Sequence, residues 1–308
     1  MRDGLLLVDK PDGCTSHDVV ASCRKILRQK KIGHCGTLDP AATGLLLLTL
    51  GRATRLTRFL IRAPKVYEGT LRLGVATDTY DATGEVVSET PVEGVDAERI
   101  AREMSTFVGT YLQSPPPYSA KKVQGKKLYE LARRGEEVPD TKKEVTIYEL
   151  EPLGLGADWT PDDDVGFRLA CSSGTYARSI AHELGAQLGV GGVLTSLRRT
   201  LIGGFQLDAA ITLDALRERV DETGAGDIGP PMVAFDAVPL PFGEVVADAQ
   251  QERRIENGQS VLFHDLEGRE GDWVKILNRR HRFIAVGAVV ERIGTGNVGV
   301  LQPKVVFR

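Results

Sequence analysis

The chain lacks any uninterrupted apolar run near the roughly 20 residues that a membrane-spanning helix requires. Its first apolar segment, at residues 4–8, is too short for the hydrophobic region of a secretory signal peptide. These two absences argue against a helical membrane protein and against a secreted one. We therefore expect a cytoplasmic protein that has no membrane partner.

Cysteine is scarce, and no two cysteines stand in a Cys-x-x-Cys pair. The five histidines do not complete a zinc-ligand spacing with the four cysteines, which are Cys14, Cys23, Cys35 and Cys171. Reduced thiols in a cytosol fit this pattern better than disulfides or a structural metal. We expect no bound metal.

A strong excess of positive charge is also missing, since the 308 residues carry a formal net charge of −3. The charges are unevenly spread, however. Residues 1–66 hold twelve Lys or Arg against five Asp or Glu, and residues 121–134 hold six against one. Two basic patches can bind a polyanion such as nucleic acid, although solvated helix faces would explain either patch alone. The second patch follows three prolines, and we expect an inserted arm over about 115–142.

The length favours two domains, and the alternation of apolar residues predicts an α+β fold. Strands are predicted at 4–8, 45–50, 65–75, 143–151, 165–171 and 193–202, and helices at 52–62, 96–107 and 212–222. A capping signature formed by Thr15 and Asp18 predicts a further helix. Another helix is expected after residues 173–175, with Tyr176 and Arg178 in its first turn.

A stretch rich in glycine and proline, residues 224–241, predicts a domain boundary. It separates a domain over 1–235 from a smaller one over 242–308. In the smaller domain a helix near 247–256 precedes short strands at 259–263, 272–277, 283–290 and 297–301. This order predicts a small β-barrel-like module.

The most informative stretch is residues 33–51, in which Asp39 is the only acidic residue. Turn-forming residues surround Asp39, and the apolar run 45–48 follows, which indicates a rigid loop that presents one carboxylate. A helix start with Asp39 as N-cap and Pro40 at the first helical position is the alternative.

Six ordered motifs give the sequence a resemblance that covers nearly the whole chain. They are Lys10-Pro11 with Thr15-Ser16-His17-Asp18-Val19-Val20, Gly33-His34-x-Gly36-Thr37-Leu38-Asp39-Pro40-x-x-Thr43-Gly44, Thr77-Asp78-Thr79-x-Asp81-x-x-Gly84 after Tyr67, Pro116-x-Tyr118-Ser119-Ala120-x-Lys122, Cys171-Ser172-x-Gly174-Thr175-Tyr176-x-Arg178, and Leu197-Arg198-Arg199. Together they resemble the bacterial tRNA pseudouridine-55 synthases of the TruB type. The match is weaker at the C-terminal end, which looks like that family's RNA-binding PUA module.

The resemblance implies a pseudouridine synthase fold, with a mixed, largely antiparallel sheet, flanking helices and an active cleft across the middle. It implies isomerisation of uridine 55 in the T-loop of tRNA, in which the uracil leaves its ribose and rejoins it through carbon. That chemistry involves no redox step and no hydrolysis, so we expect no cofactor. The expected partner is the T-stem-loop of tRNA without a guide RNA, bound by a monomer.

The family's catalytic residues fall on Asp39, Tyr67 and Arg178 in this sequence. The resemblance implies that Asp39 acts on the base or the sugar and that Tyr67 stacks on the flipped uracil. The phenol of Tyr67 could also move a proton at the sugar. Arg178 is expected to pair with Asp39 through two parallel hydrogen bonds. An ordinary strand aromatic at 67 and a phosphate-facing arginine at 178 are the alternatives.

Four further residues are expected at the substrate. His34 aligns with the family residue that fills the gap left by the flipped nucleotide, and its alternative is an ordinary loop histidine. Tyr176 belongs to the same motif as Arg178, and Leu197 matches an apolar wall of the pocket. Lys10 is expected either to support the structure or to face a phosphate.

Two other functions fit the same motifs. The guide-RNA-dependent pseudouridine synthases share the block at residues 33–40, although the 118–122 motif and the inserted arm favour the stand-alone tRNA type. A non-enzymatic protein that binds or folds RNA could use the same surfaces. An assay with tRNA and no other RNA separates the three.

Overall fold

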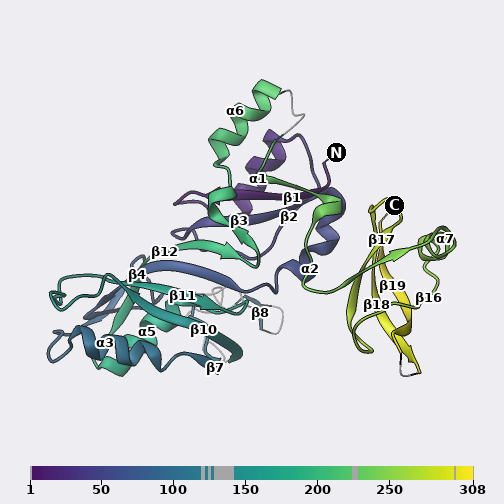
Figure 1. The fold of residues 1–308 in the computed structure, drawn as a ribbon. Helices are drawn as coiled ribbons and strands as arrows, with labels where there is room; N and C mark the ends of the chain where they lie inside the picture. The colour runs from purple at the N-terminus through teal and green to yellow at the C-terminus, as the bar shows by residue number, and fades with distance from the viewer. Residues whose placement is uncertain are drawn as a thin grey trace.

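Two sheets organise the chain in the computed structural model, a ten-stranded sheet and a five-stranded C-terminal sheet (Figure 1). The structure describes residues 2–118, 122–123, 126–127, 142–223, 228–294 and 296–307. Within the predicted arm, β8 (Lys122–Val123) pairs with β9 (Lys126–Lys127) in an antiparallel ladder. The basic side chains of residues 121–134 lie outside the described residues.

The large sheet is mixed and largely antiparallel, as predicted. Its strands follow the order β14 (Met232–Ala234), β1 (Gly4–Lys10), β3 (Thr43–Leu50), β12 (Gly192–Ile202), β4 (Lys65–Leu73), β11 (Val165–Cys171), β10 (Lys143–Leu153) and β7 (Gly109–Gln113). Beside this path, β2 (Ile32–His34) pairs with β3, and β13 (Phe205–Gln206) pairs with β12. One pairing in the sheet is parallel: it joins β3 to β12, with Thr43 opposite Arg198 and Gly44 opposite Arg199.

The leucine runs of β1 and β3 are explained by cover on both faces of that half of the sheet. Leu46 and Leu48 point into a cluster with α1 (Ser16–Ile26) and α6 (Leu213–Thr223), whereas Leu45 and Leu47 point to the opposite face. Successive side chains of a strand alternate between the faces, so a strand that is buried on both sides is apolar throughout.

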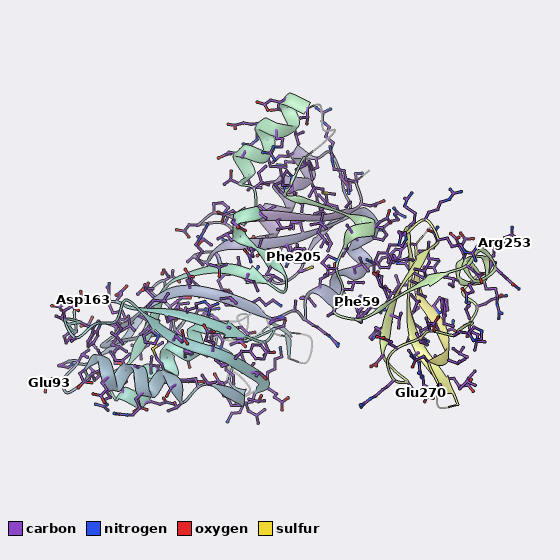
Figure 2. The ribbon with its side chains drawn as sticks, in the orientation of Figure 1. Phe59, Glu93, Asp163, Phe205, Arg253 and Glu270 are labelled. Carbon is purple, nitrogen blue, oxygen red and sulfur yellow. The ribbon has the colours of Figure 1, made fainter. Side chains whose placement is uncertain are left out.

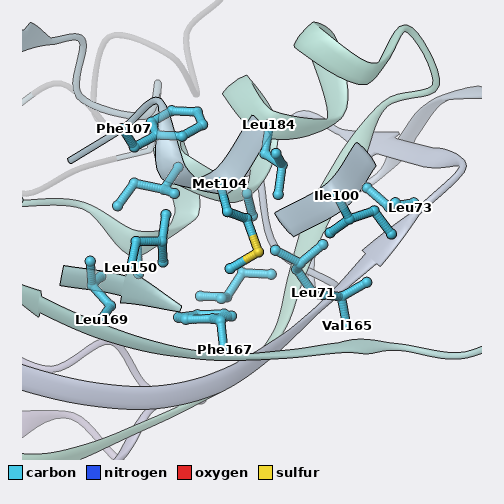
Figure 3. Close-up of a cluster of buried hydrophobic side chains, with 14 of the residues drawn as sticks. Leu71, Leu73, Ile100, Met104, Phe107, Leu150, Val165, Phe167, Leu169 and Leu184 are labelled. Atoms are coloured by element: carbon cyan, nitrogen blue, oxygen red, sulfur yellow. The ribbon is translucent and has the colours of Figure 1, made fainter. Parts of the chain in front are cut away.

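The other half of the sheet packs against α3 (Ala97–Ser105) and α5 (Ala177–Leu188). Figure 3 shows Met104 of α3 and Leu184 of α5 pointing towards Phe167 of β11. In Figure 1, α3 and α5 lie below the strands β4 and β11. This packing fixes α5, which carries Arg178, against the sheet.

Several predicted elements have different limits in the structure. The helix expected at 52–62 is a 3-10 helix, η1 (Gly51–Leu56), followed by the short α2 (Thr57–Leu60). The strand expected at 65–75 ends at Leu73, because Gly74 has φ +88°, and β5 (Val75–Thr77) then pairs with β6 (Val86–Glu89). The predicted boundary stretch contains β14, which extends the large sheet beside β1.

The C-terminal part is a curved sheet of the kind predicted for a PUA-like module. Its strand order is β15 (Glu244–Ala247), β17 (Trp273–Asn278), β18 (Phe283–Ile293), β19 (Val298–Val306) and β16 (Val261–Phe263), and α7 (Ala249–Glu256) follows β15. The prediction missed β15. Phe59 of α2 lies at the junction of the two parts (Figure 2), with its ring centroid 5.0 Å from that of Trp273. No helix in the described part of the chain is long and apolar enough to cross a membrane.

Candidate active site

Asp39 lies in the loop that joins β2 to β3, beside the parallel pairing of β3 with β12. The Asp39 carbonyl oxygen accepts a hydrogen bond of 3.1 Å from the Ala42 amide, which closes a turn around Pro40. No helix begins here, so the helix-start alternative is wrong. The Asp39 side chain remains 49 % exposed. The loop therefore presents the acid to solvent, as its sequence predicted.

Two buried side chains, Ser16 and Lys10, support this loop through hydrogen bonds to its backbone. The Ser16 hydroxyl accepts from the Leu38 amide at 2.8 Å and donates to the Leu38 carbonyl at 3.2 Å. The Lys10 ammonium donates to the carbonyls of Pro11, Pro40 and Ala42 at 2.9, 3.0 and 2.6 Å. Lys10 is fully buried, and burial lowers the pKa of its ammonium. This geometry favours the supporting role for Lys10 over contact with a phosphate.

Arg178 bridges two carboxylates. Its Nη2 lies 3.0 Å from Asp39 Oδ2, and its Nη1 lies 3.1 Å from Asp81 Oδ2. Nη1 also donates to the Thr79 carbonyl at 3.2 Å. The expected pair of Arg178 with Asp39 is present, but the expectation of two parallel hydrogen bonds to Asp39 is wrong, because the second nitrogen is used by Asp81. The arginine side chain is only 9 % exposed.

Asp81 is a residue of the site to which the sequence analysis gave no role, although it stands in one of the quoted motifs. Its Oδ1 accepts from Thr79 Oγ1 at 2.8 Å, from the Thr83 amide at 3.0 Å and from Thr83 Oγ1 at 2.6 Å. With Arg178 on the other oxygen, both oxygens of the carboxylate are bound. A carboxylate held at both oxygens fixes the guanidinium that it binds.

The sequence predicted Tyr176 in the first turn of α5. In the structure Tyr176 is instead the N-cap of this helix and has an extended backbone. Gln113 holds that backbone from both sides. Its Oε1 accepts from the Tyr176 amide at 2.8 Å, and its Nε2 donates to the Tyr176 carbonyl at 3.2 Å. Gln113, which is buried at the end of β7, therefore places the start of the helix that carries Arg178. No sequence motif had indicated this role.

Tyr67 and Arg199 face each other across the β4–β12 ladder. The guanidinium carbon of Arg199 lies 5.9 Å from the Tyr67 ring centroid, and Arg199 is 1 % exposed. Arg199 donates from Nε to the Leu45 carbonyl at 2.7 Å and from Nη2 to the Gly36 carbonyl at 3.2 Å. Burial raises the pKa of the Tyr67 phenol, and the charge of Arg199 opposes that shift. Tyr67 is therefore neutral near pH 7.

The two remaining predicted residues are Leu197 on β12 and His34 on β2. Leu197 is opposite Gly69 in the β4–β12 ladder and packs, partly buried, on the same apolar cluster as Tyr67. His34 is on β2, and its ring centroid lies 5.3 Å from that of His17 in an edge-to-face contact. Burial lowers the pKa of His34, and so does the neighbouring His17. A neutral imidazole is the consequence.

The described residues contain no group of three or more His, Cys, Asp or Glu side chains that could hold a metal ion. A cavity of about 930 Å³ lies away from Asp39, between α2 and the C-terminal sheet, and its lining includes Arg58, Phe242 and Trp273. What distinguishes the Asp39 region is instead a half-exposed acid supported by buried cations that donate to backbone carbonyls. Such a site can stabilise charge that develops while a bond breaks, and it can transfer a proton.

Comparison with known proteins agrees with the motifs. The model of the TruB family pseudouridylate synthase N-terminal domain matches residues 24–177, and that of the tRNA pseudouridylate synthase B C-terminal domain matches residues 178–246. Two similar curated proteins are both named tRNA pseudouridine synthase B. The one from Solibacter usitatus is 42 % identical over 94 % of this chain and 96 % of its own, and the one from Ralstonia pickettii is 40 % identical over 98 % and 93 %.

Among solved structures, a chain in the crystal structure of a Cbf5-Nop10-Gar1 complex is similar to this fold, with a TM-score of 0.73. That likeness covers 99 % of this chain and 85 % of the other at 27 % sequence identity. The similarity to the curated relatives is higher and covers nearly all of both chains. With both family models matched end to end across residues 24–246, the chain belongs to the TruB family of pseudouridylate synthases.

Proposed function

We propose that this protein isomerises uridine 55 in the T-loop of tRNA to pseudouridine and that Asp39 is its catalytic carboxylate. The proposal depends on one observation: the Asp39 side chain is half exposed in a turn that buried side chains support, and its carboxylate lies 3.0 Å from the guanidinium of Arg178. The curated relatives, named tRNA pseudouridine synthase B, supply the substrate class.

The reaction breaks the bond from ribose C1′ to uracil N1 and forms a bond from C1′ to C5 of the same base. The base C5 loses a proton, and N1 gains one, so nothing is consumed. A single carboxylate together with a group that can move a proton provides the chemistry that these steps need. We propose no cofactor and no metal.

The roles proposed for the other residues come from the family resemblance, and their positions support them. Arg178 directs the Asp39 carboxylate, and the neutral ring of Tyr67 provides the platform for the flipped uracil and a phenol that can move a proton. Leu197 lines the apolar side of the pocket beside Tyr67. His34, at the entrance to the Asp39 loop, fills the space that the base vacates, and Tyr176 packs at the start of α5 beside the substrate.

In this proposal the protein acts alone on tRNA, as a monomer in the cytoplasm, without a guide RNA. The absence of a guide RNA is proposed because the chain is 40–42 % identical to the proteins named tRNA pseudouridine synthase B over almost the full length. It is only 27 % identical to the chain from the Cbf5-Nop10-Gar1 complex. We assign catalysis to residues 1–235 and RNA binding to 242–308.

The direct test incubates the purified protein with unmodified tRNA and no other RNA, and maps pseudouridine along the product. We expect modification at position 55. Modification that requires an added guide RNA would favour the guide-dependent class. Tight binding without any modification would favour a non-enzymatic RNA-binding protein.

Asp39→Asn tests the catalytic assignment in the same assay. It removes the charge with little change in volume, so turnover should be lost while tRNA affinity stays within about threefold, since substrate binding and charge stabilisation are separable. Asp162→Asn, the same change on an exposed loop, is the control and should behave as the parent. Normal turnover by Asp39→Asn would remove Asp39 from the mechanism.

A further inference from the structure

Residues 77–84, the Asp81 turn, contain a residue in an unfavourable backbone conformation. Tyr80, immediately before Asp81, has φ +65°, which is uncommon for a bulky side chain. Strain of this kind persists where the surroundings enforce it, and it concentrates at functional sites. The Tyr80 carbonyl accepts from the Leu194 amide at 3.1 Å, and the Ala82 amide donates to the Leu194 carbonyl at 2.9 Å. These bonds tie the turn to β12 on one side only.

On its other side the Asp81 turn meets α5 through two rings. The Tyr80 ring stacks on the imidazole of His182 with centroids 3.8 Å apart and planes 7° from parallel. His182 lies four residues after Arg178, so both side chains project from the same face of α5. One face of α5 therefore contacts the Asp81 turn at two points: Arg178 binds the carboxylate of Asp81, and His182 stacks on the ring of Tyr80.

The imidazole of His182 has one nitrogen that makes no hydrogen bond in the described part of the chain. That nitrogen, Nδ1, is buried. A buried polar atom without a partner costs free energy and calls for an explanation. Burial also lowers the pKa of His182, so the ring is neutral near pH 7 and interacts with Tyr80 as one flat ring with another.

We propose that the stack of Tyr80 on His182 positions the Asp81 turn against α5, so that Asp81 and Asp39 can share Arg178. Tyr80 and His182 are positioning residues in this inference, because they act through Asp81 and Arg178 and do not touch the reacting atoms. The inference rests on the proposed function for its effect on rate. Its structural part, that the stack orders the turn, does not depend on any activity.

The test compares two variants of the full-length protein. His182→Ala removes the ring, whereas His182→Phe keeps a flat ring on Tyr80. Hydrogen exchange of the amides in residues 77–84 should rise about tenfold or more in His182→Ala and stay within about twofold of the parent in His182→Phe, because local opening follows the loss of local contacts. His264→Ala, the same change at an exposed residue of the C-terminal module, is the control.

The single-turnover rate at saturating tRNA, measured with the dissociation constant, adds the functional readout. We expect His182→Ala to lose about tenfold in rate with tRNA affinity within about threefold, since small misplacement of a catalytic group costs rate rather than binding. His182→Phe should restore the rate to within about twofold.

Three results would overturn the proposal: unchanged exchange at 77–84 in His182→Ala, a slow His182→Phe, or a loss of affinity in His182→Ala with the rate intact. If the parent makes no pseudouridine, the proposed function fails while the exchange experiment still decides the role of the stack.

Discussion

Arg178 is the residue on which the acidic groups of the site converge. Its two terminal nitrogens point to different carboxylates, with Nη2 on Asp39 and Nη1 on Asp81. A planar guanidinium can make both contacts at once, because its donors are fixed in a fork. Asp81 is itself fixed by Thr79 and Thr83. The direction of the Asp39 carboxylate is thus set by residues of a different loop.

Arg178→Lys should therefore fail to preserve activity although the charge is kept. One ammonium on a flexible stem cannot reproduce the two separate contacts, and we expect a loss of about 10²-fold in the single-turnover rate with tRNA affinity within about threefold. Arg72→Lys is the matched control, because Arg72 forms an exposed pair with Asp164, 2.8 Å away and remote from Asp39. A parental rate for Arg178→Lys would mean that Arg178 acts only as a positive charge.

At the level of elements, the position of the candidate active site depends on the parallel pairing of β3 with β12. This pairing brings the end of the Asp39 loop beside Arg199, which lies opposite Tyr67 on the next strand. Gly44 makes this approach possible. It has φ +96°, and a Cβ on it would lie 2.4 Å from the Arg199 carbonyl oxygen and 2.8 Å from the Arg199 nitrogen. Only a residue without a side chain fits there.

Gly44→Ala should consequently destabilise the protein, by about 2–4 kcal/mol, since the backbone of β12 must move and an L-residue is strained at that φ. Urea unfolding followed by circular dichroism measures the change. Gly204→Ala is the control, because a Cβ on Gly204 meets nothing within 4 Å, and it should stay within about 0.5 kcal/mol of the parent. Equal losses in the two variants would contradict the close approach seen at Gly44.

Local signals in the sequence predicted the elements well, and contacts between distant segments explain what they missed. The capping box of Thr15 and Asp18 forms as expected, because both partners lie within one turn of chain. The strand β14 was hidden in a stretch rich in glycine and proline, because its pairing with β1 depends on residues more than 220 positions away.

In the candidate active site, too, local sequence signals predicted some features, and contacts between distant segments were missed. The loop around Asp39 was predicted from its own glycines and proline, and the family motifs indicated the pair with Arg178. The sharing of Arg178 with Asp81 was not predicted, since 97 positions separate the two partners and only the fold brings them together. Gln113 was missed for the same reason, because it lies 63 positions from Tyr176, whose backbone it holds.

On the scale of the whole molecule, the two sheets share an apolar core, and polar contacts also join them, such as the hydrogen bond from the Phe283 amide to Asp236 Oδ1. One cluster contains Leu5 and Leu7 of β1 together with Phe283 and Phe307 of the C-terminal part. Phe235, at the junction, stacks on Phe283 with centroids 5.0 Å apart. Deletion of residues 242–308 would expose this cluster, so single substitutions test the role of the C-terminal part more cleanly.

Phe283→Ala should destabilise the entire protein and not only the C-terminal sheet. Phe283 is 2 % exposed and also contacts Phe307 edge to face at 4.9 Å, so its removal leaves a cavity that costs about 3–5 kcal/mol. Because the cluster reaches β1 of the large sheet, the fluorescence of Trp273 and Trp159 should report one shared, lowered unfolding midpoint. Trp159 packs on the cluster between α3, α5 and the large sheet, and not on the cluster that holds Phe283, which makes it the stricter probe of coupling. Val290→Ala, on the same strand but 46 % exposed, should change stability by less than about 0.5 kcal/mol. Two separate midpoints, with only the Trp273 signal shifted by Phe283→Ala, would show that the C-terminal part unfolds as an independent unit.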